Sequence, residues 1–183
     1  EQAGTFQLPE AQLDRFLIQP SVGYPDREAE GQLLDANSST EAITRLGPVS
    51  STEEIIAMQE FCQGVSLPEP VKMYIVDVCQ ATRTDSSLLM GASSRASIAL
   101  VKAARVRAAA QGRDTVLPDD VRALLGAVIE HRLILTPDAQ LRDETVSNVL
   151  ERILTRIPVP LGVAEVSPAQ RLRHVRMRVQ IRN

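Results

Sequence analysis

The chain has 183 residues, a formal net charge of −3 and 44% hydrophobic residues, enough for a packed core in one domain or slightly more. The mildly acidic balance argues against a general nucleic-acid-binding protein, and no apolar run reaches the roughly 18 residues that a membrane span needs. Aromatic residues make up only 3%, so we expect a core of Leu, Ile, Val and Ala, which suits packed helices better than a β-sandwich.

The chain opens with a short predicted helix over residues 9–14 and a predicted strand over residues 16–22. Proline is favoured at the start of a helix, and Pro9 lies there. We expect Phe16 to face inward and to leave Arg15 projecting. The strand would be the last of a sheet whose other strands are not in this sequence, and its unpaired N–H and C=O groups would need cover.

The next stretch combines a capped helix with a linker. Asp26 is expected to cap the helix, and a polar linker over residues 38–50 follows, with a short strand around Ile43. Ser51 and Glu54 have the spacing of a capping box, in which each residue satisfies the other's end of the first helical turn.

Four amphipathic helices are predicted between residues 51 and 131. The clearest covers residues 68–83, where apolar side chains recur at three- and four-residue spacing. Those side chains are Val71, Tyr74, Ile75, Val78 and Cys79. In the first helix the corresponding residues are Ile55, Met58 and Cys62. Single apolar stripes on four helices can be buried only against one another, which predicts a small helical bundle.

The third of these helices starts after Gly91 with an unusual first turn. Ser93 or Ser94 can act as the N-cap, and Arg95 follows in the first turn. A cation there costs up to ~1 kcal/mol, because the helix N-terminus is itself partly positive. The cost is offset if an anion such as phosphate binds between them. The alternative is an ordinary solvated surface arginine.

The C-terminal part begins with a predicted helix over residues 144–156 that ends before Pro158. Beyond it, residues 175–182 alternate apolar and polar side chains and could form a short β element. The tail also carries Arg171, Arg173, Arg176, Arg178 and Arg182. Two interpretations stay open: a disordered or edge-strand tail, or a basic contact for an acidic partner or a nucleic acid.

The cysteines and histidines do not predict a metal site. Cys62 and Cys79 are the only cysteines, and both fall in predicted helices, so we interpret them as reduced thiols of a cytoplasmic protein. Together with His131 and His174 they lack a recognisable ligand spacing. His131 closes a predicted helix, where a cation is favoured, and we interpret it as a terminal contact rather than a catalyst.

Two stretches of the sequence resemble motifs of one family. Residues 1–16 read Glu-Gln-Ala-Gly-Thr-Phe-Gln-Leu-Pro-Glu-Ala-Gln-Leu-Asp-Arg-Phe, and residues 91–96 read Gly-Ala-Ser-Ser-Arg-Ala. They are similar, in this order, to the end of the nucleotide-binding core and the start of the lid helix in the MoxR family of AAA+ ATPases. The resemblance extends over roughly residues 1–160.

The resemblance implies a mainly α fold, a small helical-bundle AAA+ lid domain with a leftover core helix and strand before it. It divides the chain into the end of the core (1–25), the lid (26–140) and a C-terminal helix with a basic tail (141–183). Arg15 then resembles the catalytic arginine finger, and Arg95 resembles the nucleotide-binding sensor 2 arginine. The phosphate-binding loop and the acidic Walker B strand of the family are not in this sequence, so we expect this chain alone to be inactive.

By the same resemblance, the full-length protein would hydrolyse ATP with Mg²⁺ between neighbouring subunits of a homo-oligomer, a hexameric ring. It would act as a chaperone-like motor for the assembly or maturation of protein complexes, with a von Willebrand factor A domain protein as its client. The residues by themselves leave an alternative of another class, a non-enzymatic helical adaptor or weak nucleic-acid-binding module.

Overall fold

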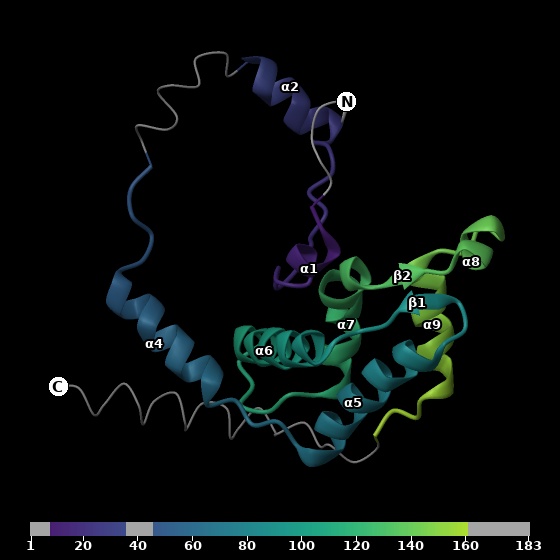
Figure 1. The fold of residues 1–183 in the computed structure, drawn as a ribbon. Coiled ribbons are helices and arrows are strands. Elements are labelled where there is room, and N and C mark those ends of the chain that lie inside the picture. The colour runs from purple at the N-terminus through teal and green to yellow at the C-terminus, as the bar shows by residue number, and fades with distance from the viewer. Residues whose placement is uncertain (1–7, 36–45, 161–183) are drawn as a thin grey trace. The chain divides into compact units, whose positions relative to one another are not determined.

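The computed structural model describes residues 8–35 and 46–160, and it is mainly helical, as the sequence predicts (Figure 1). The described residues form two compact units, one within residues 20–60 and one that combines residues 8–19 with residues 61–160. The three domain boundaries inferred from the family resemblance stay a prediction, because compactness by itself does not test them.

The smaller unit begins with α2 (Arg27–Asp35). The Asp26 carboxylate accepts a hydrogen bond from the Ala29 backbone N–H at 2.8 Å, which confirms the predicted cap. The strand expected around Ile43 lies outside the described residues, and so does the β element expected in residues 161–183.

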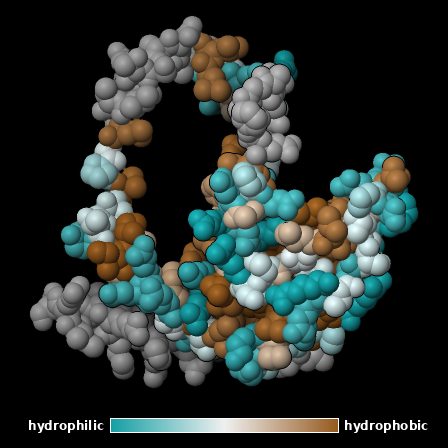
Figure 2. Space-filling view, in the orientation of Figure 1, coloured by the Kyte–Doolittle hydropathy of each residue, from teal (hydrophilic) through white to brown (hydrophobic). Residues whose placement is uncertain are grey.

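Helix α4 (Thr52–Gln63) starts with the predicted capping box. The Ser51 hydroxyl accepts from the Glu54 N–H at 3.2 Å, and the Glu54 carboxylate accepts from the Ser51 N–H at 2.9 Å. No residue of this fully described helix is buried, and Figure 2 shows hydrophobic residues at its surface. The predicted burial of α4 is therefore wrong. Ile55, Met58 and Cys62 share one face by their spacing, but Ile56 follows Ile55 directly and points to another side of the helix.

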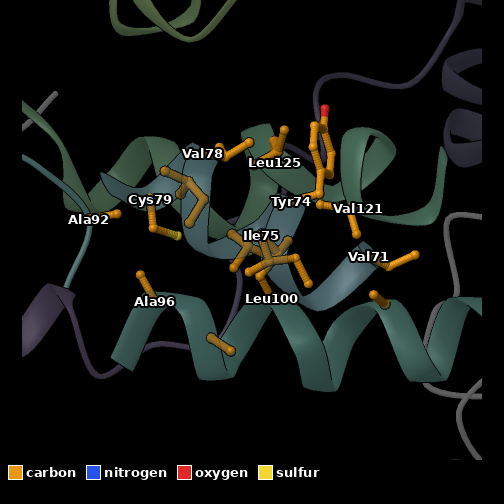
Figure 3. Close-up of a cluster of buried hydrophobic side chains, with 14 of the residues drawn as sticks. Val71, Tyr74, Ile75, Val78, Cys79, Ala92, Ala96, Leu100, Val121 and Leu125 are labelled. Carbon is orange, nitrogen blue, oxygen red and sulfur yellow. The ribbon is translucent and has the colours of Figure 1, made fainter. Parts of the chain in front are cut away.

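The larger unit is built around α5 (Glu69–Thr84), α6 (Ser94–Ala110) and α7 (Pro118–Ile129), whose apolar faces meet in one core (Figure 3). The stripe predicted for α5 is confirmed, because each of its five side chains is at most 2% exposed. One of them, Tyr74, has a buried hydroxyl group that finds no hydrogen-bond partner among the described residues.

Helix α6 contributes a face of small side chains to this core. Small residues let neighbouring helices approach closely, because side-chain size sets the distance between helix axes. The buried residues on this face are Ala96, Ala99, Leu100, Ala104 and Ala108. Val121 and Leu125 of α7 lie in the same core (Figure 3). A further helix, α9 (Val146–Arg156), packs on α5.

Short elements connect these helices. Strand β1 (Leu88–Met90) pairs antiparallel with β2 (Ile134–Leu135). The 3-10 turn η1 (Glu130–Arg132) follows α7 directly, and α8 (Pro137–Leu141) precedes α9.

The N-terminal segment of the larger unit contains the predicted helix but not the predicted strand. Helix α1 covers Glu10–Leu13. Residues 16–22 form no strand, and Phe16, expected to face inward, is 54% exposed. A strand needs a neighbour that pairs its backbone groups, and none lies beside this segment in the described part of the chain. Instead, the Gln19 N–H donates to the Ala127 carbonyl oxygen at 2.8 Å.

Candidate functional site

The loop before α6 is fixed against the end of α5. A Cβ atom at Gly91 would lie 2.6 Å from the Thr82 carbonyl oxygen, so only glycine fits this close approach. The Thr82 hydroxyl accepts from the Ala92 N–H at 2.9 Å and donates to the Cys79 carbonyl oxygen at 2.7 Å. The Arg83 Nε donates to the Ala92 carbonyl oxygen at 2.7 Å. These contacts determine where the N-terminus of α6 lies.

Ser93 caps α6, as predicted, because its hydroxyl accepts from the Ala96 N–H at 3.3 Å. Arg95 follows in the first turn with a side chain that is 55% exposed. An anion does lie beside this turn, the carboxylate of Asp14, and the phosphate that the sequence suggested there stays a prediction. The Ser93 hydroxyl donates to Asp14 Oδ1 at 3.0 Å, and Arg95 Nη1 donates to Asp14 Oδ2 at 3.3 Å.

The same carboxylate holds a third donor that sequence reasoning missed, Arg132 of η1. Its side chain is only 2% exposed, and its Nε donates to Asp14 Oδ1 at 3.1 Å. Its Nη2 donates to the Asp14 carbonyl oxygen at 3.2 Å and also to the Phe16 carbonyl oxygen, while Nη1 donates to Val128. Burial lowers the pKa of Arg132 and the charge of Asp14 opposes that shift, but a guanidinium stays protonated at any physiological pH.

His131 contacts the same backbone. Its Nε2 lies 3.2 Å from the Phe16 carbonyl oxygen. A carbonyl oxygen only accepts, so the proton is assigned to Nε2, which leaves Nδ1 without a proton in the neutral ring. Burial is the main cause that lowers the pKa of His131, and the nearby charge of Arg132 lowers it further. His131 is thus a terminal contact, as predicted, but its environment favours the neutral donor over the cation.

Arg15 lies between the two residues that Arg132 holds. Its side chain is exposed, and no hydrogen bond or ion pair joins it to another of the described residues. The structure therefore places both predicted arginines, Arg15 and Arg95, next to Asp14: the first is its neighbour in sequence and the second is its ion-pair partner.

The two ion pairs of Asp14 differ in strength. An exposed pair such as Asp14–Arg95 contributes about 0–1 kcal/mol to stability. Removing one partner of a buried pair costs about 3–5 kcal/mol, because the other charge stays buried without compensation. Asp14 is 24% exposed in its side chain and Arg132 almost fully buried, so Arg132 is the firm partner and Arg95 the one that can be released.

The described residues offer groups that favour an anion rather than a ligand set for a metal ion. Arg95 and the first turn of α6 offer positive charge and backbone N–H groups. Within residues 8–35 and 46–160, no group of three His, Cys, Asp or Glu side chains could hold a metal ion. Both cysteines are free thiols, and no helix of the described part is long and apolar enough to cross a membrane.

Comparison with known proteins relates this chain to a family. Residues 80–153 match the family described as the AAA lid domain. The chain is 38% identical over 161 residues to the uncharacterized protein YeaC of Bacillus subtilis, covering 88% of this chain and 50% of that protein. It is 35% identical over 169 residues to chaperone MoxR1 of Mycobacterium tuberculosis, covering 87% and 44%.

A solved structure extends the similarity to the fold. The crystal structure of a protein from Cytophaga hutchinsonii, provisionally named an ATPase, superposes with a TM-score of 0.80 at 30% sequence identity. The match covers 87% of this chain and 51% of that one. The chain thus spans about half the length of the relatives it matches.

Proposed function

This chain belongs to the MoxR family of AAA+ ATPases, and on that premise we propose that it is the C-terminal part of a ring ATPase in which Arg15 is the arginine finger. The observation that carries the proposal is the exposure of Arg15 between two backbone carbonyls that Arg132 holds. A side chain that projects from a fixed backbone can reach a neighbouring molecule without first ordering its own segment.

The chemistry of phosphoryl transfer gives such an arginine its role. Negative charge develops on the γ-phosphate oxygens of ATP in the transition state, and one guanidinium can hold two of these oxygens at once. Arg15 would supply this charge to the nucleotide of the next subunit. Mg²⁺ would bind together with ATP, and the described residues contain no ligand set of their own for it.

Arg95 is the proposed sensor 2 residue. It lies in the first turn of a 17-residue helix, where the helix dipole and the backbone N–H groups also favour an anion. A phosphate oxygen would replace the Asp14 carboxylate as its partner.

The physiological role is proposed from the family. The relative from Mycobacterium tuberculosis is named a chaperone. We extend that role to this protein as a hexameric, cytoplasmic motor that helps protein complexes assemble or mature. A protein with a von Willebrand factor A domain is the proposed client.

The finger is tested by Arg15→Ala in the full-length ring. Arginine fingers contribute roughly 10³- to 10⁵-fold to the rate of phosphoryl transfer, so hydrolysis should fall by this factor while ATP affinity changes little. Arg15→Lys should be nearly as poor, because an ammonium group cannot bridge two oxygens. Steady-state hydrolysis and nucleotide binding are measured on the same preparations.

A mixing experiment identifies the subunit on which Arg15 acts. Rings of Arg15→Ala are mixed with rings that lack the Walker B acid. In a mixed ring, the intact nucleotide pocket of an Arg15→Ala subunit can then face the intact Arg15 of a neighbouring Walker B variant. Partial recovery of hydrolysis is expected. If mixed rings form and hydrolysis does not recover, Arg15 does not act on the neighbouring subunit.

A further inference from the structure

The Asp14 carboxylate is the point where the N-terminal segment, the start of α6 and η1 meet. It accepts hydrogen bonds from Ser93 and Arg95 at the start of α6 and from Arg132 of η1. We propose that Asp14 is the positioning residue for Arg15, held permanently by Arg132 and reversibly by Arg95. This inference rests on the proposed function of Arg15 as the finger.

The permanent part of this arrangement is the Arg132 guanidinium. It donates to the side chain and the carbonyl oxygen of Asp14 and to the carbonyl oxygen of Phe16. Arg15 lies between these two residues, so its backbone is fixed on both sides by one buried side chain. Because Arg132 follows α7 directly in η1, the backbone of Arg15 is attached to the bundle rather than to a loop.

The reversible part is Arg95, whose exposed guanidinium makes one long bond of 3.3 Å to Asp14. Loss of that bond leaves the carboxylate with Ser93 and Arg132, so Asp14 stays paired. A phosphate at the start of α6 would therefore draw Arg95 away without leaving an unpaired carboxylate. The Asp14 carboxylate thus connects Arg95, which would meet a nucleotide, with Arg15, the proposed finger, which follows Asp14 directly in the chain.

The positioning role is tested without nucleotide on the full 183-residue chain. Hydrogen–deuterium exchange is followed in peptides that cover residues 12–19. Asp14→Asn and Arg132→Lys should each accelerate exchange there by about tenfold or more, since each weakens the contacts that close this segment. Arg95→Ala should leave exchange at the wild-type rate, and Asp14→Glu, which keeps the charge, should lie closer to wild type than Asp14→Asn.

Matched controls are available on the same bundle. Asp77→Asn and Arg122→Lys make the same chemical changes at exposed positions of α5 and α7. Neither should alter exchange in residues 12–19. If Asp14→Asn and Arg132→Lys behave like these controls, Asp14 does not position Arg15. If Arg95→Ala accelerates exchange as much as Arg132→Lys, the assignment of permanent and reversible partners is overturned.

Kinetics of the full-length ring separate this inference from the finger itself. Asp14→Asn and Arg132→Lys should lower kcat by about 10- to 100-fold with the KM for ATP nearly unchanged, the effect expected of a misplaced catalytic group. If the kcat of Arg15→Ala is normal, Arg15 is not the arginine finger, whatever the exchange experiment shows about the contacts of Asp14. A full loss in Arg15→Ala with a normal kcat in both positioning variants would remove only the inference.

Discussion

The Phe16 carbonyl oxygen accepts hydrogen bonds from two consecutive side chains, His131 and Arg132, that differ in their response to pH. The guanidinium keeps its charge, whereas the imidazole can gain a proton only at Nδ1. That atom is buried and has no partner in the described part of the chain. A protonated His131 would therefore bring an uncompensated donor, and a second positive charge, next to Arg132.

The lowered pKa of His131 predicts a stability change below neutral pH. In the unfolded chain the histidine regains its ordinary pKa of 6.5, so the unfolded state binds more protons over the interval below that value. The contribution of His131 is complete above pH 6.5 and decreases as the pH falls towards the folded-state pKa. Thermal unfolding at pH 7.5 and pH 5.5 should show a smaller fall in Tm for His131→Gln, which can donate but does not titrate, than for wild type. Equal falls would contradict this prediction.

Single residues were predictable where the signal is local. The sequence around Gly91 predicts a cap at Ser93, which is present. An anion also lies near Arg95, but it is the carboxylate of Asp14, and the phosphate suggested there stays a prediction. That the anion is Asp14 could not be predicted, because no spacing connects residues so far apart. Arg132 was missed for the same reason: its hydrogen bond to Asp14 joins positions 118 residues apart. Two arginines near it, Arg15 and Arg95, were assigned their roles as finger and sensor 2 only through the family resemblance, and these roles stay predictions.

At the scale of elements, the loop before α6 lies so close to the end of α5 that one added methyl group at Gly91 should lower the stability of the fold. In Gly91→Ala the new Cβ would lie 2.7 Å from the Arg83 backbone nitrogen, so the loop or the helix end must move. Overpacking of this kind costs about 1–3 kcal/mol. Thermal and urea unfolding of the 183-residue chain should show a clear loss of stability.

Gly126→Ala is the matched control for that substitution. Gly126 lies inside α7, and the nearest atom to an added Cβ is the flexible Glu130 carboxylate oxygen at 3.4 Å. Alanine is a better helix former than glycine by up to about 1 kcal/mol, so this variant should be as stable as wild type or more stable. A loss of equal size in both variants would show that the Gly91 contact is not the cause.

Helices and caps could be predicted where residues within the same segment determine their structure. The α5 stripe and the caps of α2 and α4 follow from spacing within a few positions, and the structure confirms them. The strand over residues 16–22 and the burial of α4 were wrong, because a strand needs a partner and a helix face needs a surface to cover it. Neither is encoded within the segment itself.

For the whole molecule, we predict that the 183-residue chain alone neither binds ATP tightly nor hydrolyses it. The printed sequence has no G-x-x-x-x-G-K-[ST] loop, whose backbone N–H groups and lysine hold the phosphates. Two exposed arginines cannot replace that loop. Titration calorimetry with Mg-ATP should show no micromolar binding, and a micromolar site would mean that this chain holds nucleotide by groups other than those named here.

The burial of Tyr74 gives this protein a built-in optical signal. The sequence has two tyrosines and no tryptophan, and Tyr24, in the smaller unit, is 97% exposed. Unfolding of the bundle moves the phenol ring of Tyr74 from an apolar surrounding into water, whereas Tyr24 is already solvated. The ultraviolet absorption band of tyrosine therefore reports on the bundle alone, without a label or an added chromophore.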